Sequence, residues 1–444
     1  MTPFWADLRA LWRLALPLAV AQAGQATMGL VDTAVVGHVS AIAQGGAGLG
    51  NSLTFTVCFF GMGVLMGVDP QVAQALGAGQ PKRARTLYWV GVWLAGATSL
   101  VLMAVLAGLP AVLGWMDVSP DVAAAARTYM WWRLPGIPAQ LLFVVARGYL
   151  QCLGQARTMV WAMVLANLAN AGLDVVLVFG AGPIPTYGVA GAAVATSLVT
   201  WLQFGVLTLA LPPSDGPVRR FDGPALKQTL RVGLPIGLHL LAESGVFSVA
   251  GLLAARLGDV ASASHQVALN WASLTFCVAV GIGSAAMVRV GWAVGAGDTP
   301  SARRSGFVAL ASGAAFMGCT GLGFLLASSA LAQVMSSEAA VVALASSLLG
   351  VTAVFQVSDG LQAVGAGALR GAGDTRFVFW ANVVGHWAVG LPLAYVLGVD
   401  GTLGVVGVWW GLSAGLTAVA VALVVRFALL TRRDVVPLHV ADAH

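Results

Sequence analysis

The chain has 444 residues, of which 59% are hydrophobic and 9% are charged, and its formal net charge is +5. Apolar runs recur from end to end, so this composition excludes a soluble domain and indicates a polytopic membrane protein. The positive charge does not indicate nucleic-acid binding, because the basic residues lie in short loops. The four cysteines form no CxxC pair, which is typical of small buried hydrophobic residues rather than of a disulfide framework or a metal site.

The apolar runs predict an all-α integral membrane protein with twelve transmembrane helices. Clusters of Gly, Pro and charged residues separate the runs. The first run is too long for a cleavable signal peptide and is expected to act as its own targeting signal. The predicted spans are 11–39, 50–76, 86–109, 122–147, 158–180, 188–212, 228–256, 266–294, 304–330, 338–368, 376–398 and 403–430.

The first span carries one carboxylate, Asp32, deep in its second half. A charge within hydrocarbon is costly, and such residues tend to line ion or substrate pathways. Gln25 lies two helical turns earlier on the same face, and Pro17 lies near the start of the span. We expect Asp32 to take part in coupling-ion or proton chemistry, and the alternative is a structural carboxylate paired with a neighbouring helix.

Basic residues gather in alternate loops, for example in 77–85, in 211–224 and at Arg370 and Arg376, whereas the intervening loops hold almost none. Because Lys and Arg are enriched in cytoplasmic loops, we expect a multi-pass protein of the cytoplasmic (inner) membrane with both termini in the cytoplasm.

The two halves of the chain repeat. LPLAV at 16–20 corresponds to LPIGL at 234–238, and VAQALGAG at 72–79 corresponds to VGWAVGAG at 290–297, each pair 218 positions apart. Six repeated spans without an odd helix keep the same orientation, which predicts a parallel duplication, a common plan in transporters. The expected division is an N-lobe at 1–212, a cytoplasmic connector at 213–227 and a C-lobe at 228–444.

Span five carries a second embedded acid, Asp174, on one helical face with Asn170 and Asn167. Thr196 in span six could add a hydroxyl oxygen. Together with Asp32 these oxygens could hold Na⁺, or the two carboxylates could share a proton, because nearby like charges disfavour double ionisation. The alternative is an interhelical hydrogen-bond cluster that only holds helices together.

A second set of polar side chains lies in the C-terminal half, with its members one helical turn apart on shared faces. We expect these side chains to line a polar cavity that receives cations, and the alternative for each histidine is a core partner of a carboxylate. The set comprises His239 with Glu243, Gln356 and Gln362 with Asp359, and Asn382 with His386.

Sequence motifs of enzymes are missing from the chain. There is no HExxH, nucleophile elbow or Walker motif, and GAG at 77–79 and 295–297 lacks the strand context of a phosphate loop. We therefore expect neither an enzyme nor an ATPase, with no cofactor apart from the coupling ion. Asp69, which precedes Pro70 within the second span, is either functional or the cap of a helix break.

The sequence resembles the multidrug and toxic compound extrusion (MATE) family and its NorM-like bacterial branch. The resemblance covers nearly the whole chain, and it implies a V-shaped pair of six-helix lobes of the MATE/MOP type that export organic cations by alternating access against an H⁺ or Na⁺ gradient. It rests on Pro17 with GLVDTAVVGH around Asp32, VAQALGAG at 72–79, the Asn170–Asp174 pair, RVGLPIG before Glu243, and SDGLQAVGAGALRGAGDT at 358–375.

The resemblance also implies site residues. A coupling-cation site of the family matches Asp32, Asn170, Asp174 and Thr196, and a second site for a coupling cation or substrate matches Glu243 and Asp359. Bending of the first helix has been proposed near the position of Pro17. The residues expected to line the cavity are Gln25, Asn167, His239, Asn382 and His386. The implied partners are organic cations such as drugs and dyes, and membrane lipids, with the chain acting as a monomer.

Two other functions stay open at this stage. A flippase for lipid-linked precursors or polysaccharides, from the same superfamily, usually has a more cationic cavity, whereas the embedded charges here are mainly acidic. A passive channel would depend only on the gradient of its own solute, and an enzyme would need a nucleophile–base pair or a metal cluster. The sequence leaves open the coupling ion, H⁺ or Na⁺, and the natural substrate.

Overall fold

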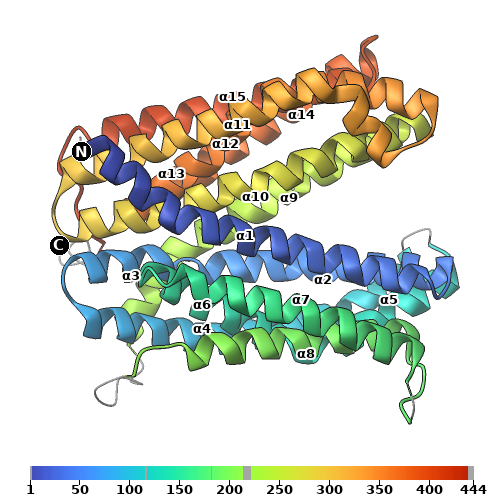
Figure 1. Ribbon diagram of the computed structural model, residues 1–444, viewed down its shortest axis with the longest axis horizontal. Helices are drawn as coiled ribbons and strands as arrows, with labels where there is room; N and C mark the ends of the chain where they lie inside the picture. Colours follow the sequence, from blue (N-terminus) through green and yellow to red (C-terminus); the bar gives the residue numbers. More distant parts are fainter. Residues whose placement is uncertain (1–2, 116–117, 182, 214–221, 439–444) are drawn as a thin grey trace. The chain divides into compact units, whose positions relative to one another are not determined.

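The structure is a computed structural model that describes residues 3–115, 118–181, 183–213 and 222–438 (Figure 1). Helices make up nearly all of this described part, which confirms the all-α fold class. Residues 214–221 of the predicted connector lie outside the described residues. The helices are α1 (Pro3–Gly37), α2 (Ala41–Leu65), α3 (Val68–Gly77), α4 (Pro81–Gly108), α5 (Pro120–Arg133), α6 (Ile137–Cys152), α7 (Ala156–Phe179), α8 (Gly188–Leu209), α9 (Gly223–Arg256), α10 (Asp259–Gly295), α11 (Thr299–Met335), α12 (Ala339–Gly371), α13 (Thr375–Asn382), α14 (Leu391–Tyr395) and α15 (Val405–Leu430).

The twelve predicted spans correspond to single helices or to consecutive ones. Eleven helical stretches of the described chain are long and apolar enough to cross a membrane. The predicted fourth span is divided between α5 and α6 by a short 3₁₀ segment, η2 (Leu134–Gly136). Pro135 lies within this break, where its missing N–H and its ring interrupt the ladder of α-helical hydrogen bonds.

The contacts of the chain divide it into two compact units. Unit 1 contains Met1–Val20, Ala73–Gly79 and Leu238–His444, and unit 2 contains Ala21–Val72 and Gln80–Gly237. The chain passes between the units within α1, α3 and α9, and once in the turn after α3. The lobes predicted from the repeat divide the chain differently, by sequence similarity, and they stay a prediction.

In unit 2, glycines allow α9 to approach α2 and α3 closely. A Cβ at Gly63 would lie 2.5 Å from the Cα of Gly237, and a Cβ at Gly67 would lie 2.6 Å from the Cα of Gly233. Small residues at helix crossings let backbones pack directly in membrane proteins. These glycines therefore fix the position of the first half of α9 in unit 2.

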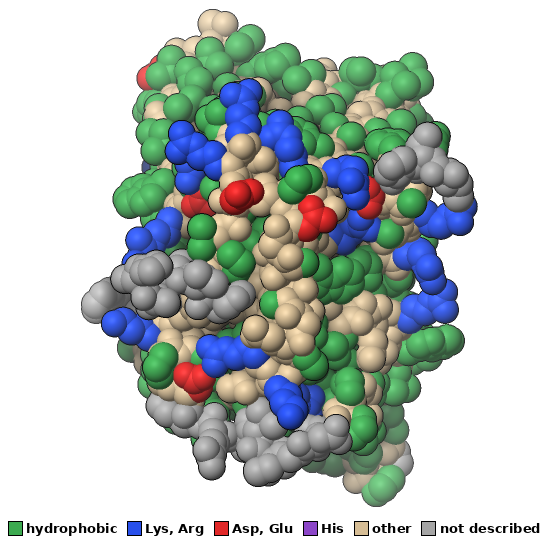
Figure 2. Space-filling model, turned by 90° about the vertical axis from the view of Figure 1, so that its left-hand side faces the viewer, with side chains coloured by type: hydrophobic (Ala, Val, Ile, Leu, Met, Phe, Trp, Pro, Cys, Tyr) green, Lys and Arg blue, Asp and Glu red, His purple; other side chains and the backbone are tan. Residues whose placement is uncertain are grey.

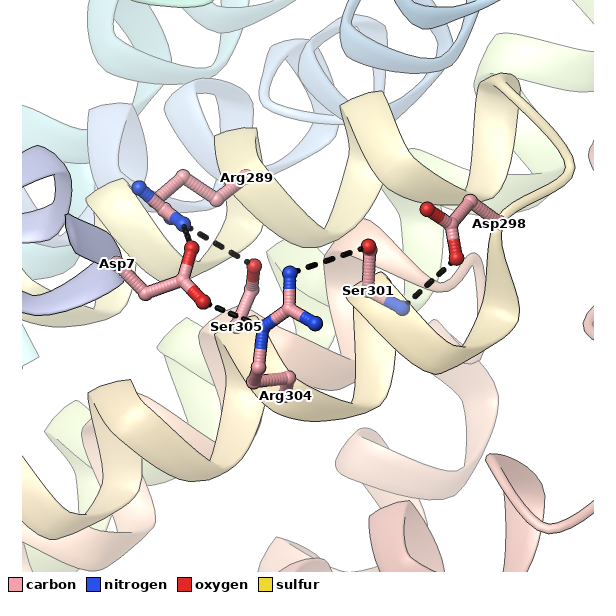
Figure 3. Close-up of polar contacts among 6 residues, drawn as sticks. All are labelled: Asp7, Arg289, Asp298, Ser301, Arg304 and Ser305. Atoms are coloured by element: carbon pink, nitrogen blue, oxygen red, sulfur yellow. Dashed lines mark hydrogen bonds and ion pairs between the residues drawn. The ribbon is translucent and has the colours of Figure 1, made fainter. Parts of the chain in front are cut away.

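In unit 1, an ion-pair cluster holds the first turns of α1 (Figure 3). The two carboxylate oxygens of Asp7 each lie 2.5 Å from an arginine nitrogen, one on Arg289 of α10 and the other on Arg304 of α11. Asp298 caps the N-terminus of α11 and accepts a hydrogen bond from the Ser301 amide at 2.9 Å. One acidic side chain thus joins three helices of this unit.

Unit 1 also contains a large apolar core beside the polar residues of the second half. Trp409 of α15 is fully buried in it and packs edge-on against Phe355 of α12, with ring centroids 5.5 Å apart. Phe355 lies one helical turn before Asp359. The core therefore holds α12 at the position from which Asp359 projects.

Candidate functional site

Three helices of unit 2 bring the predicted N-lobe residues together. Asp32 lies on α1, Asn170 and Asp174 on α7, and Thr196 on α8. The Thr196 hydroxyl lies 3.1 Å from Asp32 Oδ2 and 2.9 Å from the Ala192 carbonyl oxygen, so its one proton is shared between two acceptors. The Asp174 carboxyl lies close enough to the Asp32 carboxyl for two negative charges there to oppose each other.

This cluster has an excess of oxygen atoms over donors. Asn170 and Asp174 are completely buried. Within the described part of the chain, neither carboxylate oxygen of Asp174, neither polar atom of the Asn170 amide, and not Oδ1 of Asp32 has a hydrogen-bond partner. Buried polar atoms without partners are costly. A proton or a small cation would give the oxygens of this cluster their missing partner, and oxygen ligands suit Na⁺ as well as H⁺.

The analysis of the sequence missed Tyr129 of α5. Its hydroxyl lies next to Thr196 and within electrostatic range of Asp32 and Asp174, and it donates to Asn51 Oδ1 of α2 at 3.2 Å. Neither Tyr129 nor Asn51 shares a helix with an embedded acid, so no spacing pattern pointed to them. The cluster therefore receives residues from five helices of unit 2.

Other predicted residues lie outside this cluster of oxygens. Asn167 donates to the Gly24 carbonyl oxygen at 3.1 Å and to the Met163 carbonyl oxygen at 2.9 Å, so it joins α7 to α1 as the structural alternative proposed. Gln25 is exposed on α1. Pro17 lies inside α1, three residues before the chain passes from unit 1 to unit 2.

An open cavity of about 520 Å³ lies beyond the oxygen cluster along α1 and α7. Its lining includes Val35 and His38 of α1 and Phe179 of α7. Val35 lies one helical turn after Asp32, and Phe179 follows Asp174 on α7. An apolar and aromatic opening thus lies about a turn from the buried acids.

The predicted C-lobe residues are also brought together, within unit 1. Glu243 of α9 has Gln362 Nε2 of α12 at 3.2 Å from its Oε1 and His239 Nε2 at 3.3 Å from its Oε2. Asp359 of α12 is 5% exposed and lies in the field of Glu243. The predicted pairing of His239 with a carboxylate is therefore present.

Two further residues complete this C-lobe cluster. Asn382, at the end of α13, accepts from Gln362 Nε2 at 3.1 Å. His386 lies in a π-helical segment, η3 (Val383–Gly390), and is 2% exposed within electrostatic range of Glu243 and His239. Gln356 is directed elsewhere, because it donates to Thr275 at 2.5 Å.

Arg370 is the functional candidate of this cluster that sequence analysis missed. The sequence placed it among the basic residues of a loop, but it lies in the last turn of α12 and its Nη2 is 3.0 Å from His239 Nδ1. Its position next to a loop concealed that its side chain points back towards the helices.

Asp69 lies apart from both acidic clusters, in the first turn of α3. It is 6% exposed, packs against Gly148 of α6, and lies within electrostatic range of Arg147. Its position just after the break between α2 and α3 agrees with the alternative of a cap at a helix break.

A family model and the sequences of known relatives both match this chain. The MatE family model matches residues 17–176 and again residues 235–396, and the two matches begin 218 positions apart, as the internal repeat does. "Multidrug resistance protein NorM" of Burkholderia vietnamiensis is 37% identical over 431 residues, which cover 94% of this chain and 93% of the relative. "Multidrug resistance protein MdtK" of Edwardsiella ictaluri is 34% identical over 448 residues, which cover 98% of each chain.

Solved structures show the same fold. A eukaryotic MATE transporter, AtDTX14, superposes with a TM-score of 0.87 at 20% identity, covering 97% of this chain and 98% of that one. A multidrug resistance MATE family transporter of the MOP superfamily, in an outward-facing conformation, superposes with a TM-score of 0.88 at 21% identity, covering 96% and 97%.

Proposed function

Because the chain belongs to the MATE family of transporters, we propose that it is a secondary active exporter that exchanges organic cations, such as drugs and dyes, for H⁺ or Na⁺. Its relatives named for multidrug resistance support this function over that of a lipid-linked precursor flippase, a channel or an enzyme. The embedded acids support a cationic cargo, since a pyrophosphate-bearing cargo would meet repulsion from them.

The observation that carries the proposal is the buried cluster of Asp32 and Asp174 without a basic partner among the described residues. Two adjacent carboxylates repel each other, so a proton, a Na⁺ ion or an organic cation stabilises them. Asp32, Asn170, Asp174 and Thr196 supply the oxygens that would hold the coupling cation. Glu243 and Asp359 would hold a coupling cation or the cargo in the second cluster.

Exchange follows if cargo and coupling cation favour different conformations or compete for the same carboxylates. A ligand shifts a conformational equilibrium only by its difference in affinity for the two states. Neutralisation of Asp32 and Asp174 by the coupling cation would remove the charge that holds an organic cation and release it.

The expected membrane orientation places both termini in the cytoplasm of a bacterial cell, in the inner membrane. Lys and Arg side chains gather on the face drawn in Figure 2, with fewer Asp and Glu side chains. Basic residues in the loops on one side of the spans support a cytoplasmic location of that side. We expect the chain to act as a monomer in contact with membrane lipids.

The test is efflux of ethidium from proteoliposomes with a pH gradient or a Na⁺ gradient imposed separately. One of the two gradients should drive export, and Asp32→Asn should abolish the driven component. Asp121→Asn, which removes an exposed acid of α5, serves as the matched control. Export by correctly inserted Asp32→Asn at the wild-type rate would contradict the proposal, as would transport that responds to neither gradient.

A further inference from the structure

Two chains of polar contacts converge on the Glu243 carboxylate, one by hydrogen bonds and the other ending in an ion-pair contact, and the donor direction of each chain is fixed at its far end. A backbone carbonyl oxygen can only accept a hydrogen bond, and a guanidinium can only donate one. One chain ends at a carbonyl oxygen and the other at Arg370. The direction of every bond in between therefore follows from the order of the residues.

The first chain reaches Glu243 through two amides. Asn382 Nδ2 donates to the Val378 carbonyl oxygen at 2.9 Å. The other amide atom of Asn382, Oδ1, therefore faces Gln362 and accepts from its Nε2 at 3.1 Å. The same Nε2 carries a second proton and lies 3.2 Å from Glu243 Oε1. This chain thus delivers a donor to one oxygen of Glu243.

The second chain reaches Glu243 through an imidazole. Arg370 Nη2 lies 3.0 Å from His239 Nδ1. Since arginine stays protonated, Nδ1 must accept, and the ring proton of neutral His239 lies on Nε2. Nε2 lies 3.3 Å from Glu243 Oε2, which is within ion-pair distance, although the two atoms are not aligned for a hydrogen bond. A second donor therefore faces the other oxygen.

Asp359 has a different environment. It is 5% exposed, and among the described residues no Lys, Arg or His forms an ion pair with it. The negative charge of Glu243 opposes a second negative charge there. The titratable and charged groups around Glu243 are His239 on its own helix, Asp359 and Arg370 on α12, and His386 on η3.

We propose that Arg370, acting through His239, keeps Glu243 a permanent anion that attracts the organic cation, while Asp359 carries the exchangeable proton of the same cluster. This inference rests on the proposed export function and assigns separate roles to its two C-lobe acids. Arg370 is a positioning residue, because it fixes which nitrogen of His239 bears the proton. If Arg370 could accept as well as donate, the proton of neutral His239 could lie on Nδ1, and Nε2 would then direct a lone pair at Glu243 in place of a donor.

The tautomer of His239 is measured directly by ¹⁵N NMR of the ring nitrogens in the full chain in lipid vesicles, with His239→Gln used to assign its signal. We expect the ring proton of neutral His239 to lie on Nε2 and not on Nδ1. Arg370→Lys, which keeps a cationic donor, should preserve this tautomer, and Arg370→Gln, whose amide can accept, should allow the ring proton to lie on Nδ1 as well. A wild-type signal of an imidazolium, or of the proton on Nδ1, would overturn the proposal.

The protonated acid is identified by infrared spectroscopy, because the chain has only two glutamates, Glu243 and Glu338. A C=O band of a protonated carboxyl that is lost in Asp359→Asn should not move when the protein is labelled with ¹³C-glutamate. A band that moves with this label and disappears in Glu243→Gln would refute the assignment. Neither spectroscopic measurement needs transport, so a failure of the export function is distinguished from a failure of this inference.

Transport provides a third readout in proteoliposomes. Arg370→Gln should raise the KM for ethidium about 10-fold, with little change in Vmax, because it weakens an interaction with a charged group. Arg370→Lys should keep the wild-type KM. An equal loss of Vmax at all pH values in both variants would show a merely structural role and overturn the proposal.

Discussion

The Asp7 ion-pair cluster allows a stability prediction for Asp7→Asn. The Asp7 and Arg289 side chains are 15% and 12% exposed, whereas Arg304 is 48% exposed. Removal of one partner from a fully buried pair costs roughly 3–5 kcal/mol, and an exposed pair contributes at most about 1 kcal/mol. Asparagine keeps one acceptor oxygen, and the pair retains some contact with solvent. We therefore expect a destabilisation of about 2 kcal/mol, most of it from the uncompensated charge of Arg289.

The assay for Asp7→Asn is the unfolding transition of the purified protein in one detergent, compared with Asp434→Asn. Asp434 is an exposed acid after α15, so this control removes the same charge without breaking a described ion pair. Asp434→Asn should unfold like the wild type. If the two variants were equally stable, the cluster would not anchor α1, and the reasoning from burial would be wrong.

Three further variants test other contacts. Gly67→Ala should reduce the folded yield, since its Cβ would lie 2.6 Å from a backbone atom of α9, whereas Gly96→Ala, with nothing within 4 Å, should not. Thr196→Val should weaken gradient-driven ethidium export about 10-fold, because Asp32 loses its hydroxyl donor, and an unchanged rate would exclude Thr196 from the site. Asp222 is partly buried, but hydrogen bonds from the Ala225 amide and Arg83 outweigh that burial and hold its pKa below the usual value. The contribution of the Asp222 carboxylate to stability is therefore present above the ordinary pKa of about 3.9 and is lost as the pH falls through the lowered pKa. When the free energy of unfolding is measured against pH, Asp222→Asn should fall less steeply than the wild type on the acidic side.

The periodic parts of the structure could be predicted from the sequence because hydrophobic length and helical spacing determine them. Twelve apolar runs indicated the helices, and the spacing of Asn170 and Asp174 placed both on one face of α7. The structure adds contacts between helices, which spacing within one helix does not encode. Tyr129 joins the acidic cluster from α5, although its sequence neighbours carry no polar pattern that points there.

Arg370 shows a second limit of the sequence. Its position between an apolar run and a loop gave it the ordinary interpretation of a topology-determining charge. A long side chain can reach back from the end of a helix to a buried partner, and only the packing of α12 beside α9 indicates that partner. The break of the fourth span has a signal in the sequence, because Pro135 and Gly136 follow Arg133 there, but a count of apolar residues overlooks it.

The passages of the chain between the two units have a consequence for insertions. The chain crosses between the units within α1 and α9, a few residues after Pro17 and Pro235. Both helices are continuous at these points, and no loop interrupts them. One residue added after Val20 would rotate the remainder of α1 by about 100° and advance it by about 1.5 Å. The helical register of α1 thus connects the ion pairs of Asp7 near its start with the Asp32 carboxylate near its end.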